Sequence, residues 1–407
     1  VVDMDRWDDD DDNDDEALPA ATLKDEEEEK DLPSSLPGRP DADDDDDDEE
    51  PSGGGGRRRR RRVPLFDGCR SVDEFERLDR IDEGSYGVVY RARDNETKEV
   101  VALKRVKLTR ESCAEGFPIT ALRETNVLLA LSRCEHVVSV KEMVVGREFD
   151  KVFMVMEYFD HDLKTCVEKH DGPFPQGDVK SLFVQLLAGV EYLHSKWFMH
   201  RDIKTSNLLY QNRTGRLALA DFGLARRFGD PPPKKESHRD QQYTRNVVTL
   251  WYRCPELLLG ATTYAGPDVD MWSVGCVFAE LLLRRSLFNA KTELEQISQI
   301  FGLLGLPTED RWPGFKDLPI AQTFKFKAQK RNKLRESLPT TGFTASRLTG
   351  NASTPLSETG LDLANALLNL DPKQRASAAQ ARDHPYFSEA PLPTPRHLMP
   401  KFQLDRL

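Results

Sequence analysis

The first regular pattern along the chain is a series of short apolar runs separated by turn signals. Between residues 75 and 106, β-branched and aromatic residues gather at 88–91 and 100–106, with Asp94 and Asn95 between the two runs. Runs of this length and composition, bounded by turn-forming residues, are typical of strands joined by tight turns. The pattern predicts an antiparallel meander over this stretch.

A single helix is predicted after these strands. Apolar residues occur at Leu122, Val127, Leu128 and Leu131, and the last three are spaced to share one face of a helix. Pro118 precedes them and suits the first turn of a helix, because its missing N–H would have no partner there in any case. This part of the chain is therefore expected to hold several strands and one helix.

Beyond residue 163 the pattern becomes helical. Apolar residues at helical spacing predict helices at residues 176–194, 268–283, 292–304 and 361–370. The fold class that follows is α+β in two lobes, a small antiparallel β lobe with one helix and a larger, mainly helical lobe. We place the parts at residues 1–62 for a tail, 63–74 for a lead-in, 75–158 and 159–387 for the two lobes, and 388–407 for a C-terminal tail.

The negative charge of the chain is confined to its beginning. Residues 1–50 hold 25 acidic residues against four basic ones, and Trp7 is the only aromatic residue in residues 1–62. Such a stretch buries too little apolar area to offset its chain entropy, so we expect residues 1–62 to be disordered. Six consecutive arginines at 57–62 fit an import-receptor signal, a nucleic-acid patch or a solvated charge run, and of these we favour import. We hypothesise that the acidic block at 41–50 folds back and masks the arginines.

Cysteine usage and hydropathy narrow the compartment. The six cysteines are scattered without a CxxC pair, which argues against a disulfide framework and a thiolate zinc site and favours a reducing compartment. The longest apolar stretch, at 271–283, contains Glu280 and is shorter than the roughly 18 residues that a membrane span needs. We therefore expect no membrane span.

Glycine and charged residues recur in an order that carries chemistry. Gly84 and Gly87 lie in a hairpin, where they let the backbone approach phosphate oxygens, although any hairpin can carry two glycines. The sequence VALK at 101–104 then puts a lysine on a strand, where it needs an anionic partner such as Glu124. The set ends with HRDIKTSN at 200–207 and DFG at 221–223.

In this order and spacing, the motifs resemble the protein-kinase signature set over residues 75–387. Within that family, PITALRE at 118–124, VVTLWYR at 247–253 and DMWSVG at 270–275 are similar to the cyclin-dependent kinases, serine/threonine kinases of the CMGC group. PITALRE is the form that this motif takes in the transcription-elongation kinase. Longer flanking segments, such as WPGF at 312–315, resemble the PITSLRE-type kinases linked to splicing and transcription, and we follow the longer match.

The resemblance implies transfer of the γ-phosphoryl group of ATP to proteins, with Mg²⁺ as cofactor. It gives catalytic roles to Lys104, Glu124, Asp202 as the base, Lys204 and Thr249, and Mg²⁺ ligation to Asn207 and Asp221. Around ATP it places Ile81, Gly84, Gly87, Val89, Ala102, Lys104, Met156, Glu157, Phe159 and Leu209. For the apolar members, ordinary core packing explains the sequence equally well.

The resemblance also implies sites of regulation. Thr244 matches a threonine whose phosphate draws together three mutually repelling guanidinium groups, those of Arg123, Arg201 and Arg226. Ser85 and Tyr86 resemble inhibitory phosphorylation sites, because phosphate there would crowd the phosphates of ATP; plain hairpin residues are the alternative.

Substrates and partners follow in the same way. The family turns the carbonyl at the position of Val248 away from the substrate, so the residue after the acceptor loses a partner for its N–H, and proline has no N–H to strand. We therefore predict Ser-Pro or Thr-Pro targets, with Arg253 beside Val248 in the proline pocket. A cyclin is expected to pack at Ile119, of L type if the PITSLRE match holds and of T type if PITALRE governs. The expected location is the nucleus, with the cytoplasm as a second compartment, and the expected process is transcription, splicing or the cell cycle.

Two departures from the family pattern and two rival functions accompany this interpretation. Asp82 replaces the usual first glycine of the phosphate loop, and Cys254 replaces the usual alanine, while Glu256 keeps Arg375 as the partner for a buried pair. One rival is a pseudokinase scaffold that has lost its chemistry. The other makes the charged tail a histone- or RNA-binding module with the kinase domain as a passenger.

Overall fold

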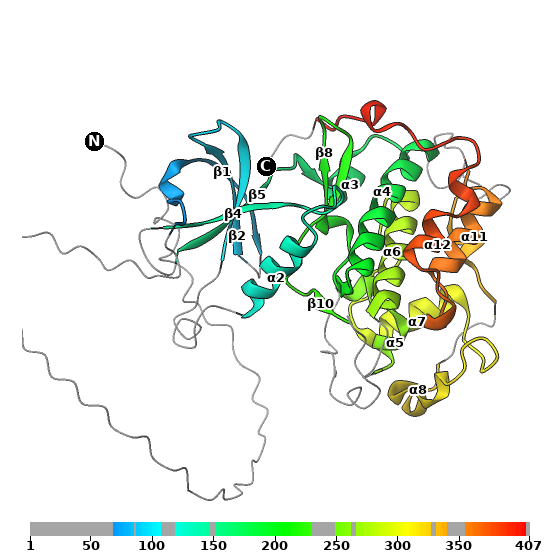
Figure 1. Cartoon of the computed structure of the whole chain (residues 1–407). Helices are drawn as coiled ribbons and strands as arrows, with labels where there is room; N and C mark the ends of the chain where they lie inside the picture. Colours follow the sequence, from blue (N-terminus) through cyan, green and yellow to red (C-terminus); the bar gives the residue numbers. More distant parts are fainter. Residues whose placement is uncertain are drawn as a thin grey trace, which may run out of the picture. The chain divides into compact units, whose positions relative to one another are not determined.

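The computed structural model describes residues 68–84, 87–106, 119–146, 151–228, 249–261, 266–326, 331–339 and 355–403. The chain divides into two units, Val1–Cys69 and Arg70–Leu407, and the second holds both lobes (Figure 1). The predicted acidic tail and its arginine run lie outside the described residues.

The first lobe is built on a five-stranded antiparallel sheet in the order β1-β2-β3-β5-β4. Its strands are β1 (Phe75–Gly84), β2 (Gly87–Asp94), β3 (Val100–Arg105), β4 (Val140–Val145) and β5 (Val152–Glu157). The predicted meander is confirmed as β1 to β3. Gly87 has φ +142°, and a Cβ there would lie 2.3 Å from the carbonyl oxygen of Arg105, so this turn requires glycine.

The predicted helix is confirmed as α2 (Ile119–Ala130). Ala121, Glu124 and Leu128 lie on its buried side, whereas Leu122 and Leu129 are 53% and 58% exposed. The spacing of the buried positions is that of one helix face. The helix therefore turns a glutamate towards the interior and two leucines towards solvent.

The residues before β1 are fixed to the edge of the sheet. Arg70 donates hydrogen bonds to Asp94 at 3.0 Å and to Glu142 at 2.9 Å. Val145 donates its N–H to the Arg70 carbonyl at 3.1 Å. The hydrogen bond of Arg70 is the main cause that holds the pKa of Asp94 well below its usual range. The ordered domain thus includes residues that precede its first strand.

The second lobe is mainly helical, as predicted. Its helices are α3 (Leu163–Lys169), α4 (Gln176–Ser195), α5 (Pro255–Leu258), α6 (Gly266–Leu283), α7 (Glu293–Leu304), α8 (Pro319–Thr323), α9 (Leu334–Ser337), α11 (Glu358–Leu367) and α12 (Ala378–Arg382). Short strands add a three-stranded sheet of β6 (His161–Asp162), β8 (Leu208–Gln211) and β9 (Arg216–Leu219), and a pair of β7 (Phe198–Met199) and β10 (Arg226–Arg227).

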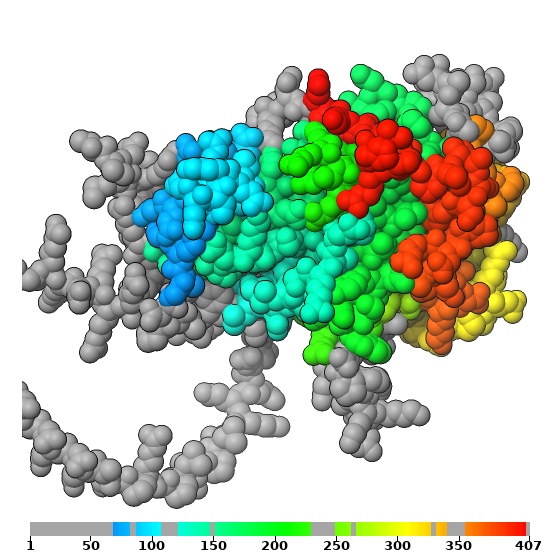
Figure 2. All heavy atoms as spheres, turned by 45° about the horizontal axis from the view of Figure 1, so that its top comes forward, coloured from blue at the N-terminus to red at the C-terminus, as the bar shows by residue number. Residues whose placement is uncertain are grey.

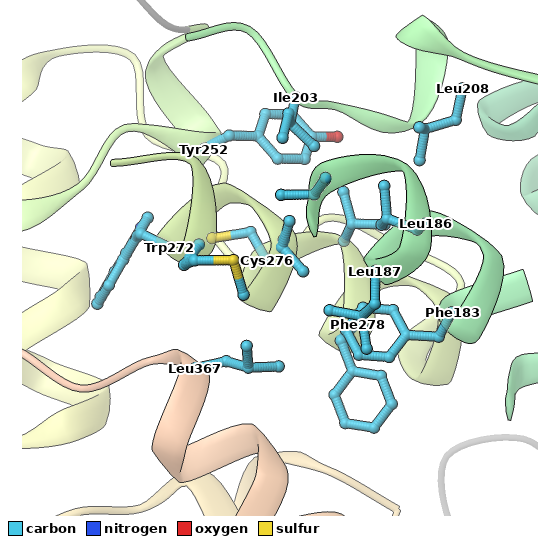
Figure 3. Packing of buried hydrophobic residues seen from close by; sticks show 14 of the residues in the cluster. Phe183, Leu186, Leu187, Ile203, Leu208, Tyr252, Trp272, Cys276, Phe278 and Leu367 are labelled. Carbon is cyan, nitrogen blue, oxygen red and sulfur yellow. The ribbon is translucent and has the colours of Figure 1, made fainter. Parts of the chain in front are cut away.

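The core of this lobe forms around α6. Fifteen of the 18 residues of α6 are buried, so the helix is covered on almost every side. Figure 3 shows Phe183 and Leu187 of α4, Trp272 and Phe278 of α6, and Leu367 of α11 in this cluster. Tight packing of large side chains makes α4 and α6 a rigid base for the loops that they carry.

Helix boundaries differ from the sequence prediction where capping groups act. The helix predicted at 361–370 runs instead from Glu358 to Leu367, because the Ser357 hydroxyl accepts a hydrogen bond from the Gly360 N–H and starts the helix earlier. The helix predicted at 292–304 begins at Glu293, since Thr292 is its N-cap residue. Apolar spacing alone does not register these caps.

The chain after α12 packs back across the second lobe. The carbonyl of Pro400 accepts a hydrogen bond from the Tyr210 hydroxyl at 2.8 Å, and the Phe402 ring packs edge-on against the Tyr210 ring. Figure 2 shows the red C-terminal segment lying against the green residues of this lobe. In the part of the chain that the structure describes, no helix has the length and apolar character needed to cross a membrane.

Candidate active site

Lys104 joins the two lobes. Its Nζ donates to Glu124 Oε1 of α2 at 2.7 Å and to Asp221 Oδ1 at 3.5 Å, so the predicted partner is in place. Burial alone would lower the pKa of Lys104, but the charges of Glu124 and Asp221 outweigh it and raise the pKa. The ammonium group is therefore charged, and it lies where a third anionic group could share it.

Asp202 is the centre of a polar network. Its Oδ2 accepts hydrogen bonds from Lys204 Nζ at 2.8 Å and Asn207 Nδ2 at 3.0 Å. Its Oδ1 accepts from the Thr249 hydroxyl at 2.9 Å. Burial would raise the pKa of Asp202, yet the hydrogen bond and charge of Lys204 lower it. The carboxylate is thus ionised and oriented, as a group that must accept a proton has to be.

The backbone just before Asp202 is fixed by Asp270 of α6, a fully buried carboxylate. The N–H groups of His200 and Arg201 each donate to it at 2.8 Å. Arg201 adopts φ 68°, a conformation that the two hydrogen bonds help to hold. Sequence reasoning quoted Asp270 only as part of a family motif, although a charge at the start of an apolar helix is a visible signal.

Asn207 and Asp221 offer oxygen atoms for a divalent cation. The Asn207 Nδ2 donates to the carbonyl of Asp202 at 2.9 Å and to its carboxylate, which leaves the amide oxygen of Asn207 free to act as a ligand. Mg²⁺ prefers oxygen ligands and is commonly held by one or two protein groups together with substrate phosphates. Asn207 and Asp221 supply two such oxygen ligands, a donor set that fits this shared mode.

The residues predicted around adenine come from four strands of the first lobe, from the segment after β5 and from β8 of the second lobe. Val89 pairs with Lys104 across β2 and β3, and Ala102 pairs with Met156 across β3 and β5. Ile81 is 46% exposed, unlike a core residue. Leu209 is paired with Asp162 and Ala218 in the small sheet of the second lobe. Glu157 ends β5, Phe159 follows two residues later, and Gly84 pairs with Gly87 at the hairpin.

Two of the three predicted phosphate-binding arginines lie near each other. Arg226 belongs to β10 and pairs with Met199, the last residue of β7, which lies two positions before Arg201. The Arg201 Nε donates to the Leu224 carbonyl at 2.8 Å, two positions before Arg226. Both terminal nitrogens of the Arg201 guanidinium are buried and make no hydrogen bond among the described residues. A buried charged donor of this kind calls for an anion. Arg123 lies on α2 and is half-buried.

The predicted buried pair of Glu256 and Arg375 is present. Arg375 donates to both carboxylate oxygens of Glu256, at 2.8 and 3.0 Å, and both residues are buried. Arg253, predicted in the proline pocket, pairs with Glu293 of α7. Four predicted positions lie outside the described residues, as does the side chain of Ile119: Ser85, Tyr86, Thr244 and Val248.

The similarity of this chain to known proteins agrees with the geometry of the site. The family model of the protein kinase domain matches residues 75–387. Cyclin-dependent kinase G-2 of Oryza sativa subsp. indica is 51% identical over 348 residues, which cover 84% of this chain and 46% of that protein. Cyclin-dependent kinase 11B of Homo sapiens is 47% identical over 338 residues, which cover 83% of this chain and 39% of that protein. The chain thus spans less than half the length of these relatives.

Solved structures show the same similarity. A chain of the yeast RNA Pol II CTD kinase CTDK-1 complex matches with a TM-score of 0.66 and 36% identity, over 81% of this chain and 97% of that chain. A chain of the CAK complex from Chaetomium thermophilum, bound to ATP-γ-S, matches with a TM-score of 0.68 and 31% identity, over 81% and 95% of the two chains.

Proposed function

The chain belongs to the protein kinase family, within it to the cyclin-dependent kinases, and from this premise we propose that it transfers the γ-phosphoryl group of ATP to serine and threonine side chains. The predicted family and two-lobed α+β fold are confirmed. One observation supports the proposed activity most strongly: Lys104 bonds to both Glu124 and Asp221, so a single side chain joins α2 to the second lobe at the proposed phosphate site.

The proposed roles follow from charge and reach. Lys104 binds the α and β phosphates, and Glu124 holds the lysine in position. Asn207 and Asp221 would hold Mg²⁺, which neutralises charge on the phosphate oxygens when it is bound. Lys204 touches Asp202 and can reach the γ-phosphate as well.

Asp202 orients the acceptor hydroxyl and takes its proton. Because the pKa of this carboxylate is lowered, it accepts the proton only as the hydroxyl oxygen forms its bond to the γ-phosphorus and becomes acidic. The bond between that phosphorus and the bridging oxygen breaks in the same step, and ADP leaves. The Thr249 hydroxyl and N–H both donate to Asp202 Oδ1, and these two hydrogen bonds fix the orientation of the carboxylate. This complete network speaks against the pseudokinase alternative.

The proposed substrates are Ser-Pro and Thr-Pro sites of nuclear proteins, in transcription, splicing or the cell cycle. The Lys204 Nζ lies 3.2 Å from the Thr249 hydroxyl, and the family resemblance implies that this pair of residues is the pattern of serine/threonine kinases. A cyclin is the proposed partner, of L type or, alternatively, T type. The exposed leucines of α2 support a partner at this helix. The two solved structures that match the chain are complexes, which supports a partner for this chain as well.

Phosphate transfer from Mg-ATP to a Ser-Pro peptide tests the proposal. The full chain co-expressed with an L-type cyclin should phosphorylate the peptide, and Asp202→Asn should lower kcat by about 100-fold or more. Asp310→Asn, which alters a surface carboxylate, is the matched control and should leave kcat unchanged. A wild-type complex that binds ATP without transferring phosphate would instead support the scaffold alternative.

A further inference from the structure

The segment that connects the two lobes is held by an arginine that sequence reasoning did not single out. β5 ends at Glu157 and β6 begins at His161, so residues 158–160 form the connection. Arg216, the first residue of β9, donates through Nη2 to Glu157 Oε2 at 2.7 Å and through Nη1 to Oε1. Its guanidinium also lies over the Phe159 ring, 5.0 Å from the centroid. One side chain therefore contacts both Glu157 and Phe159, and the kinase resemblance implies that the backbone of these two residues binds the edge of adenine.

The backbone around Arg216 is held by hydrogen bonds to α4. Gln185, a buried residue of α4, accepts a hydrogen bond from the Leu217 N–H at 2.9 Å and donates to the Gly215 carbonyl at 3.1 Å. These two bonds fix the backbone on either side of Arg216. Its Nε donates to the carbonyl of Glu135 at 2.6 Å, so the guanidinium plane is fixed in a further direction.

The C-terminal segment also packs against the residues around Arg216. Arg396 Nη1 lies 2.8 Å from Glu135 Oε2, the side chain of the residue whose carbonyl receives the Arg216 Nε–H. A Cβ at Gly215 would lie 2.1 Å from the Arg396 carbonyl oxygen, which shows how closely the segment packs beside Arg216. The residues on either side of Arg216 are therefore held by α4 and by the C-terminal segment.

The bidentate pair restricts Glu157 more than a single charge contact would. The side chains of Arg216 and Glu157 are only 15% and 21% exposed, so water competes weakly for the contact. A planar guanidinium facing a carboxylate fixes orientation as well as distance. The Glu157 N–H donates to the Ser139 carbonyl at 3.0 Å, so both its main chain and its side chain are held.

The other end of the connection has its own supports. The Asp160 N–H donates to the Tyr210 carbonyl at 3.2 Å, and the Asn212 N–H donates to Asp160 Oδ2 at 2.9 Å. These contacts fix the exit from the connection, whereas Arg216 fixes its entry.

We propose that Arg216 is a positioning residue for nucleotide binding, which holds the backbone of Glu157 and Phe159 in the arrangement that receives adenine. The inference rests on the proposed function, because it concerns the adenine end of the same site. Arg216 acts only through these two residues. Its loss should weaken the binding of substrate and transition state equally, which raises KM and leaves kcat unchanged.

The test uses the full chain with its cyclin and two readouts. Arg216→Met should raise the KM for ATP about 5- to 10-fold and change kcat less than about twofold. The inhibition constant of adenosine, which has no phosphates, should rise by the same factor. Arg216→Lys keeps the charge but loses the bidentate geometry of the guanidinium group, so the KM for ATP and the inhibition constant of adenosine should both be intermediate. Arg382→Met, which removes a 2.6 Å ion pair with Glu191 elsewhere, should change neither.

Exchanging the charges gives a second test. The double variant Arg216→Glu with Glu157→Arg should recover part of the adenosine affinity that either single change removes. An unchanged KM and adenosine constant in Arg216→Met, or a fall in kcat with KM unchanged, would overturn the inference while the proposed function stands. If Arg216→Met does not fold, Arg216→Lys decides in the same way. A wild-type complex without ATP turnover or adenosine binding would overturn the proposed function and this inference together.

Discussion

Lys104 Nζ lies 2.7 Å from Glu124 Oε1 and 3.5 Å from Asp221 Oδ1, so one side chain links β3, α2 and the second lobe. Any displacement of α2 moves Glu124 and therefore acts directly on the proposed phosphate site. A partner bound to the outer side of α2 would control catalysis by this short route. The ion pair thus joins the proposed regulation to the proposed chemistry.

The outer side of α2 gives the first prediction. Leu122→Asp combined with Leu129→Asp should weaken cyclin binding at least about tenfold, because both side chains are exposed and would lie in an apolar interface. The thermal stability of the chain alone should not change. Leu398→Asp, at a leucine that is 65% exposed on the C-terminal segment, is the control. Co-purification should recover an L-type cyclin, and recovery of neither an L- nor a T-type cyclin would contradict the proposed partner.

The unpaired nitrogens of Arg201 give a prediction for activation. Phosphate on Thr244 should satisfy them, so Thr244→Ala should lower kcat about tenfold or more while ATP affinity stays nearly constant. Thr323→Ala, at an exposed threonine of α8, should have no effect. Kinetics on the phosphorylated complex measure both quantities. Normal turnover in Thr244→Ala would contradict a phosphate site at these arginines.

The buried pair of Arg375 and Glu256 gives a prediction for stability. Arg375→Met leaves a buried carboxylate without its partner and should lower the free energy of unfolding by about 3–5 kcal/mol. Adding Glu256→Leu should recover much of this loss, since the uncompensated charge is then removed. Urea unfolding measures the difference, with Arg335→Met at an exposed pair as control. Equal stability of the single and double variants would show that the charge does not matter.

Asp268, in the first turn of α6, gives a prediction for pH. Burial, as the largest cause, raises the pKa of its carboxyl from 3.8 to about 6, against the opposing effect of Arg375. Between these two values the folded chain binds more protons than the unfolded chain, so the free energy of unfolding falls as pH rises through this window. Asp268→Asn should therefore gain stability relative to wild type as pH rises from about 4 to 7. Parallel stability curves for the two proteins would refute this assignment.

The candidate catalytic residues could be identified from the sequence because their residue types and their order along the chain are visible there. Lys104, Asp202 and Asp221 stand in short motifs, and the structure places Lys104 beside Asp221 and Asp202 beside Lys204. The helix at Glu358–Leu367 was misplaced by three residues because its start depends on the Ser357 hydroxyl, which apolar spacing does not register.

The residues that support the site were less accessible to sequence reasoning. Arg216 and Glu157 are 59 positions apart, and Thr205 and Glu280, which form a buried hydrogen bond, are 75 positions apart. No periodicity connects such residues, because their contacts depend on how β9, β5 and α6 pack in space. Arg253 was predicted in a substrate pocket, but its ion pair with Glu293 could not be predicted, because this contact depends on the position of α7.

The most direct test of the central claim is to label the chain with an acyl-phosphate derivative of ATP, which acylates lysines beside bound phosphates. In the full chain with its cyclin and Mg²⁺, mass spectrometry should find the label on Lys104 and Lys204, and excess ATP should abolish it. Lys104→Met should lose the first label, while Lys373→Met, at an exposed lysine, should change nothing. Labelling that spreads over surface lysines and resists competition by ATP would contradict convergence of these residues on one nucleotide.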